Sequence, residues 1–113
     1  MIQIYHNQRC GKSRSCLLLL NESNKEIEII NYLNTPPTGA QLAALLEKLN
    51  LSPIELVRQK EQIWIENFKG KTLTENEIIQ AMAENPILIE RPIVVNGNEA
   101  IIGRDLEKVI PFI

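Results

Sequence analysis

Cys10 lies in a polar, basic stretch near the amino end of the chain, and its surroundings favour nucleophilic chemistry. The alternating apolar residues Ile2 and Ile4 indicate a strand, and the four leucines over 17–20 indicate a buried helix. A cysteine between a strand and a helix lies beside main-chain N–H groups that lack partners and beside the positive end of the helix dipole. Both features favour the thiolate over the thiol. We therefore interpret Cys10 as a candidate nucleophile.

Side chains that carry or can carry positive charge flank this cysteine, namely Arg9, Lys12 and His6. Reactive thiols are found in such electropositive surroundings, whereas most free cysteines are small buried hydrophobic residues. Cys16 fits the second description, because it adjoins the leucine run inside the expected helix. We expect Cys16 to be a packing residue.

Three other motifs are incomplete on the same residues. A nucleotide-binding P-loop ending in Gly11-Lys12-Ser13 needs glycine at position 6, which is histidine. A phosphatase-type loop needs arginine at position 16, which is cysteine. A redox Cys-x-x-Cys motif needs a second cysteine at position 13, which is serine. The positive charge for an anion, and any second thiol, must therefore come from elsewhere.

The composition predicts a globular, intracellular protein. With 113 residues, 44% of them hydrophobic, the chain can build a core without disulfides or a structural metal. The net charge of −2 argues against a nucleic-acid partner, and no apolar stretch reaches the length of a membrane span. Two cysteines and one histidine lack the spacing of a zinc site. We expect a cytoplasmic location, free thiols, no signal peptide and no metal.

The elements expected along the chain are strand, helix, strand, several helices, a hairpin and a last helix. The alternating run over 26–32 predicts a second strand, which with the first strand and the leucine helix makes a parallel βαβ unit. Residues 93–102 predict a β-hairpin, in which Asn96-Gly97 suits a two-residue type I′ turn. A final helix is expected from Asp105. This order predicts an α/β, thioredoxin-like domain over 1–113 with a mixed four-stranded sheet.

The middle of the chain, about 38–85, is predicted to be a helical insert between the two halves of that domain. Capping boxes mark helix starts at Thr38 and Thr74. The pair Ser52-Pro53 marks the start of another short helix, which is expected to carry Arg58.

With these residues identified, the chain resembles the glutaredoxin-linked arsenate reductase family of the thioredoxin fold over essentially its whole length. The resemblance rests on three segments: Tyr5-His6-Asn7-x-x-Cys10-x-x-Ser13-Arg14, Tyr32-Leu33-x-Thr35-Pro36-Pro37 and Ile87-Leu88-Ile89-Glu90-Arg91-Pro92-Ile93-Val94-Val95. It implies that Cys10 attacks arsenate, and that Arg58, Arg91 and Arg104 bind the oxyanion and stabilise the thiolate. Arginine suits that role because it stays charged and offers forked donors to an oxyanion.

The resemblance also implies roles for the residues around the thiol. His6 is expected near Cys10, where it either helps to keep the thiol ionised or acts as a hydrogen-bonded structural residue. The residues expected to support the loop are Asn7, Gly11, Ser13 and Pro92, and the Arg91-Pro92 bond is expected to be cis and to face the thiol. Gln8 and Asp105 replace prolines that are common in the family, although neither replacement removes a catalytic group.

The chemistry implied by the resemblance uses external thiols. Glutathione attacks the covalent adduct between Cys10 and arsenate, glutaredoxin reduces the mixed species, and arsenite leaves. The expected partners are thus arsenate or a similar tetrahedral oxyanion, glutathione as co-substrate, and glutaredoxin, with no tightly bound cofactor and a monomeric protein. One alternative is a glutathione-linked oxidoreductase acting on another oxyanion. Another is a thiol-stress regulator that binds RNA polymerase, but such regulators usually use Cys-x-x-Cys, and Ser13 occupies the second position here.

Overall fold

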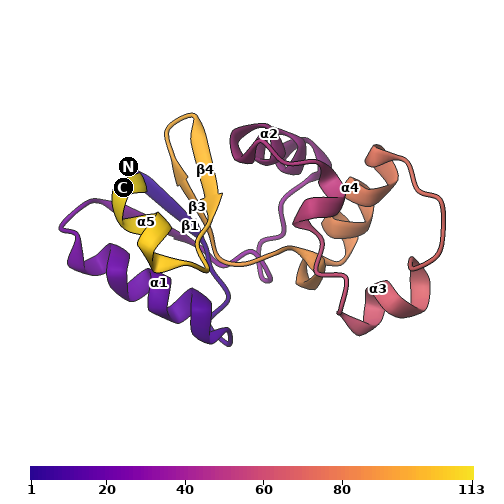
Figure 1. The fold of residues 1–113 in the computed structure, drawn as a ribbon, viewed down its shortest axis with the longest axis horizontal. Coiled ribbons are helices and arrows are strands. Elements are labelled where there is room, and N and C mark those ends of the chain that lie inside the picture. Colours follow the sequence, from indigo (N-terminus) through magenta and orange to yellow (C-terminus); the bar gives the residue numbers. More distant parts are fainter. The chain divides into compact units, whose positions relative to one another are not determined.

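The computed structural model describes all 113 residues, and the chain divides into two compact units (Figure 1). One unit comprises Met1–Thr35 and Arg91–Ile113, and the other comprises Pro36–Glu90. The insert predicted over about 38–85 falls inside the second unit. None of the helices has the length and apolar character that crossing a bilayer requires.

The first unit contains a four-stranded sheet in the order β2-β1-β3-β4. Its strands are β1 (Ile2–Tyr5), β2 (Ile27–Ile30), β3 (Ile93–Asn96) and β4 (Glu99–Ile102). β1 runs parallel to β2 and antiparallel to β3, which is antiparallel to β4. Ile4 of β1 therefore pairs with Ile29 on one side and Val94 on the other. The predicted mixed sheet of the thioredoxin-like fold is confirmed.

Two helices, α1 (Gly11–Glu22) and α5 (Leu106–Phe112), cover one face of this sheet (Figure 1). Cys16 and Leu20, one helical turn apart on α1, are fully buried in a core with Ile4, Val94 and Val109. Burying a side chain such as leucine stabilises a fold by about 1.5–3 kcal/mol. This packing fixes α1 against the sheet. It thereby also fixes the position of Cys10, which directly precedes the first turn of α1.

The second unit is helical. It contains α2 (Gly39–Leu49), α3 (Gln62–Asn67), α4 (Glu75–Glu84) and the 3₁₀ turns η1 (Pro53–Leu56) and η2 (Pro86–Leu88). The capping boxes expected at Thr38 and Thr74 are both formed. Within this unit α2 and α4 lie side by side, and Leu42, Leu45 and Leu46 of α2 are buried.

The hairpin turn differs from the prediction. Asn96 pairs with Glu99, so the two turn residues are Gly97 and Asn98. Gly97 has a φ of +65°, whereas Asn98 is not among the residues with positive φ, so the turn is not the type I′ expected at Asn96-Gly97. A physical reason is that the Asn96 side chain donates from Nδ2 to the main-chain oxygen of Phe112 at 3.0 Å, which holds Asn96 in β3.

Arg58 does not lie on a helix, contrary to the prediction. The Pro53–Leu56 segment forms a single 3₁₀ turn, and Val57 then becomes extended and bridges to Ile89. The main-chain N–H of Arg58 donates to the oxygen of Leu88 at 2.7 Å. The helix ends early because Val57 is buried and β-branched and makes this extended pairing instead.

Candidate active site

The loop that precedes α1 is closed by its own hydrogen bonds. The main-chain N–H of Cys10 donates to the oxygen of Asn7 at 3.0 Å, and the Asn7 side-chain Oδ1 accepts the N–H of Arg9 at 3.0 Å. Cys10 itself is the extended residue directly before the helix, and its oxygen accepts the first helical hydrogen bond, from Arg14 at 3.0 Å. The sulfur is therefore held at the amino end of a helix, as predicted.

The pKa of the Cys10 thiol is lowered from 9.0 to about 7. Partial burial raises this pKa, but opposing interactions outweigh it. They are, in order of size, the main-chain N–H of Ser13, the Arg91 side chain as a hydrogen-bond donor, the main-chain N–H of Lys12, and the charge of Arg91. The sulfur does not close a regular capping hydrogen bond, so the N–H groups of Ser13 and Lys12 act as nearby dipoles. These dipoles and the Arg91 guanidinium all favour the thiolate. At neutral pH about half of a thiol with such a pKa is ionised.

Arg91 lies beside this thiol and has hydrogen-bond donors without a partner. Its Nε and Nη1 are buried and make no hydrogen bond. Buried donors of a charged group are costly unless a partner satisfies them, so the guanidinium is suited to an anion that binds next to the sulfur. The Arg91-Pro92 peptide bond is cis, as the resemblance implied.

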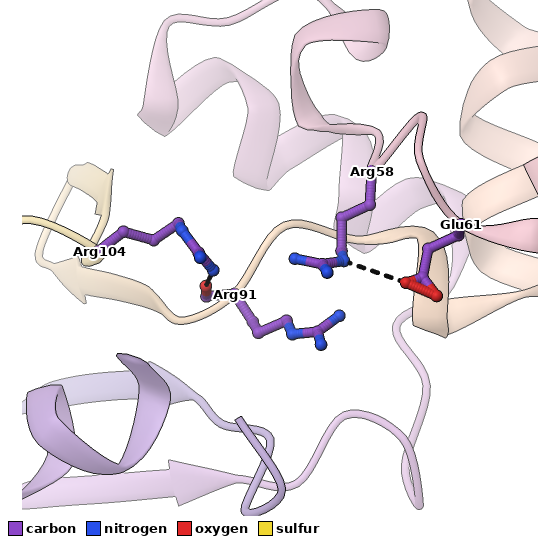
Figure 2. Close-up of polar contacts among 4 residues, drawn as sticks. All are labelled: Arg58, Glu61, Arg91 and Arg104. Carbon is purple, nitrogen blue, oxygen red and sulfur yellow. Dashed lines mark hydrogen bonds and ion pairs between the residues drawn. The ribbon is translucent and has the colours of Figure 1, made fainter. Parts of the chain in front are cut away.

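Arg104 is tied to the same segment. Its Nη1 donates to the main-chain oxygen of Arg91 at 3.1 Å, and Figure 2 shows the side chain reaching that carbonyl. As a whole, Arg104 is an exposed residue. Two of the three arginines expected at the oxyanion, separated by 13 positions in the sequence, are thus brought together.

Arg58 belongs to the helical unit. There its Nε lies 3.4 Å from Oε2 of Glu61, and both side chains are partly exposed (Figure 2). An ion pair of this kind contributes at most about 1 kcal/mol, so it leaves the guanidinium available to another anion. The expectation that Arg58 binds the oxyanion together with Arg91 and Arg104 stays a prediction.

His6 is buried and forms a hydrogen bond with Ser13. Its Nδ1 lies 2.6 Å from the Ser13 Oγ, which also accepts the main-chain N–H of Asn7 at 3.0 Å. Burial, and secondarily the charge of Arg14, lower the pKa of His6 below 6.5. The imidazole is therefore neutral at neutral pH. These features fit the structural alternative for His6 and give no support to a role as a cation beside the thiol.

The other two residues expected to support the loop have unequal roles. Pro92 is buried, and its oxygen accepts the N–H of Gly103 at 2.8 Å. Gly11 is exposed, and an added Cβ there would lie 3.6 Å from Arg14 Nη2, which is ordinary contact. The packing therefore does not require glycine at position 11.

The second cysteine takes no part in the site. Cys16 is fully buried, forms no disulfide, and its pKa is raised to about 11 by burial. The predicted packing role of Cys16 is confirmed. No group of three or more His, Cys, Asp or Glu side chains is placed to hold a metal ion.

One feature of the site was not foreseen, a cavity of about 260 Å³ beside the loop. Its lining includes His6 and Arg9 after β1 and Asn31, Leu33 and Asn34 after β2. The parallel pairing of these strands could have indicated it, because the carboxyl ends of neighbouring parallel strands meet at one edge of a sheet.

Comparison with known proteins gives matches along nearly the whole chain. The sequence model of the ArsC family matches residues 5–112. The uncharacterised protein YfgD of Escherichia coli is 47% identical over 114 residues, covering 99% of this chain and 96% of YfgD. An arsenate reductase of Neisseria meningitidis is 37% identical over 110 residues, covering 96% and 94%. The structure of an arsenate reductase from Vibrio cholerae aligns with a TM-score of 0.93 at 38% identity, covering 99% of this chain and 97% of that one.

Proposed function

Because the chain belongs to the ArsC family, we propose that it reduces arsenate to arsenite with Cys10 as the nucleophile. The relatives named arsenate reductase, from Neisseria meningitidis and Vibrio cholerae, support this substrate. The single observation that carries the proposal is the placement of Arg91, with two unpartnered buried donors, beside a thiol whose pKa is about 7.

The first step joins sulfur to arsenic. The Cys10 thiolate attacks the arsenic of arsenate, an S–As bond forms, and one oxygen takes up protons and leaves as water. Arg91 donates to the oxyanion, and its charge offsets the repulsion between a thiolate and an anionic substrate. Arg104 and Arg58 are proposed to donate to the remaining oxygens. A guanidinium fork matches two oxygens of a tetrahedral anion at once.

The later steps use thiols from other molecules. Glutathione displaces a second oxygen as water, so that arsenic carries two sulfurs. The thiolate of glutaredoxin then attacks the glutathione sulfur, and the electron pair of that S–As bond stays on arsenic, which passes from As(V) to As(III). A disulfide forms between glutaredoxin and glutathione, water displaces Cys10, and arsenite leaves. External thiols are favoured because Cys16 is buried and position 13 is serine, which leaves Cys10 without a resolving cysteine nearby.

The test is arsenate-dependent oxidation of NADPH in the presence of glutathione, glutaredoxin and glutathione reductase. We expect turnover by the wild-type chain and by Cys16→Ala, and none by Cys10→Ser. The Cys16→Ala variant also controls for loss of a thiol that the mechanism does not use. Turnover that persists in Cys10→Ser would contradict the mechanism, and a panel of other tetrahedral oxyanions tests whether arsenate is the preferred one.

A further inference from the structure

We propose that the cavity beside the active-site loop is the docking site for the peptide part of the thiol co-substrate, with Arg9 receiving a carboxylate. This inference rests on the proposed function, because it assigns a place to the glutathione used there. The cavity has a volume of about 260 Å³. That is slightly below the range of about 300–1,000 Å³ usual for small-molecule pockets, so it suits part of a tripeptide rather than a larger cofactor.

The position of the cavity follows from the sheet. β1 and β2 are parallel neighbours, and the cavity is lined by the segments that leave their carboxyl ends, 6–9 and residues within 31–34. In open α/β sheets, crevices outside the carboxyl ends of the parallel strands are the usual ligand sites. The second segment is ordered by a turn, in which the N–H groups of Asn34 and Thr35 both donate to the oxygen of Asn31 at 3.0 Å.

The chemistry of the lining fits an anionic peptide. Arg9 is the charged side chain among the lining residues, it is exposed, and its side chain makes no hydrogen bond or ion pair within its unit. The amides of Asn31 and Asn34 offer both donors and acceptors, which peptide groups require. His6 also lines the cavity, and because Nδ1 is engaged by Ser13, its Nε2 is the nitrogen left for a ligand.

The cavity is lined by the loop residues that directly precede Cys10, and the oxyanion donors do not line it. Arg9 directly precedes Cys10, and the hydrogen bonds of both residues to Asn7 hold them on one turn. Neither Cys10, Arg91 nor Arg104 lines the cavity. In the proposed mechanism the oxyanion contacts those three groups, so the cavity stays available to the second reactant while the first occupies Cys10.

Binding can be measured without any turnover, using S-methylglutathione, which keeps the carboxylates of glutathione but has no thiol. We expect backbone NMR shifts on titration to be largest at Arg9, Asn31 and Asn34. Arg9→Gln should raise the Kd about five- to tenfold, as expected for one hydrogen bond at a solvent-exposed side chain, and Arg9→Lys should raise it by less. Lys25→Gln, which removes an exposed charge before the amino end of β2, should bind as the wild type does. Shifts located elsewhere, or equal losses in Arg9→Gln and Lys25→Gln, would overturn the docking site.

Turnover separates this proposal from the function on which it rests. We expect Arg9→Gln to raise the KM for glutathione about five- to tenfold and to leave the KM for arsenate unchanged. With 2-mercaptoethanol, a thiol without a carboxylate, Arg9→Gln and wild type should behave alike. Turnover that needs Cys10 but is indifferent to Arg9→Gln would reject the docking site and keep the proposed function. Binding of S-methylglutathione that depends on Arg9, with no reduction of arsenate by either thiol, would keep the docking site and reject the proposed function.

Discussion

The guanidinium of Arg104 donates a hydrogen bond of 3.1 Å to the main-chain oxygen of Arg91. This contact links the segment after β4 to the segment before β3, so one arginine orients the backbone that carries the other. The two arginines nevertheless act differently on the thiol, since Arg91 lowers the pKa of Cys10 and Arg104 is not among the groups that do.

Replacement of Arg91 by alanine is expected to raise the pKa of Cys10 from about 7 toward 9.0, because both a hydrogen-bond donor and a charge are removed. If the whole shift were lost, the thiolate fraction at pH 7 would fall by about 50-fold, and kcat/KM for arsenate with it. The thiolate absorbance at 240 nm, followed against pH, measures the change. An unaltered titration would show that Arg91 does not stabilise the thiolate.

Replacement of Arg104 by alanine is expected to leave the pKa of Cys10 near 7 while raising the KM for arsenate about tenfold, through loss of one charged donor to the oxyanion. The same titration and steady-state kinetics on Arg104→Ala give both values. Lys108→Ala, which removes an exposed charge from α5, serves as the control. A KM equal in the two variants would remove Arg104 from the oxyanion site.

The hydrogen bonds of Ser13 are expected to stabilise the fold. Ser13 is fully buried, and its Oγ meets both His6 and the N–H of Asn7. Ser13→Ala leaves these partners unsatisfied, so the free energy of unfolding should fall by about 1–3 kcal/mol. Ser15→Ala makes the same chemical change at an exposed position of α1 and should stay within about 0.5 kcal/mol. Urea unfolding compares them, and equal stabilities would show that the Ser13 bonds contribute nothing.

Gly103 is expected to tolerate no side chain while Cys16 is present. A Cβ added at Gly103 would lie 2.9 Å from the Cys16 sulfur and 3.1 Å from Val94 Cγ2. Gly103→Ala should therefore lower the free energy of unfolding by about 1–3 kcal/mol. In the double variant Gly103→Ala/Cys16→Ala the added methyl group gains room. The double variant should therefore lose less unfolding free energy than the sum of the losses in the two single variants. Strict additivity would show that the sulfur is not what excludes the methyl group.

The ionisation of Cys10 should also be visible in stability. The pKa of Cys10 is about 7 in the folded chain and lower than the 9.0 of an unperturbed thiol, so folding favours the thiolate. The resulting stabilisation is complete above about pH 9 and is lost as pH falls through about 7. The difference in urea midpoint between the wild type and Cys10→Ser should therefore increase from pH 6 to pH 9. A difference that is constant with pH would mean that folding leaves this thiol unperturbed.

Much of the fold was predictable because its signals are local. The capping boxes at Thr38 and Thr74 need only residues three positions apart, and both form as expected. The hairpin turn was misplaced because Asn96 is held in β3 by a side-chain bond to Phe112, at the other end of the last helix. Arg58 was placed on a helix because the pairing of Val57 with Ile89 is a contact across the unit that its own neighbours do not reveal.

The candidate site divides in the same way. Cys10 was predicted from its neighbours, because the donors of Lys12 and Ser13 come from the helix that follows it. The contact of Arg91 with the thiol joins distant segments, and it was expected from a family resemblance rather than from spacing. The cavity lined by Arg9 and Asn31 was missed, since it arises from the parallel pairing of two strands and has no sequence motif of its own.

We propose that about half of Cys10 is thiolate at neutral pH and that this thiolate attacks arsenate. The most direct measurement is the rate of alkylation of Cys10 by iodoacetamide against pH, with and without arsenate, followed by mass spectrometry, with the buried Cys16 as the internal unreactive thiol. We predict a half-maximal rate near pH 7, in accord with the pKa of about 7, and protection of Cys10 by arsenate. A half-maximal rate near pH 9, with no protection by arsenate, would contradict the account.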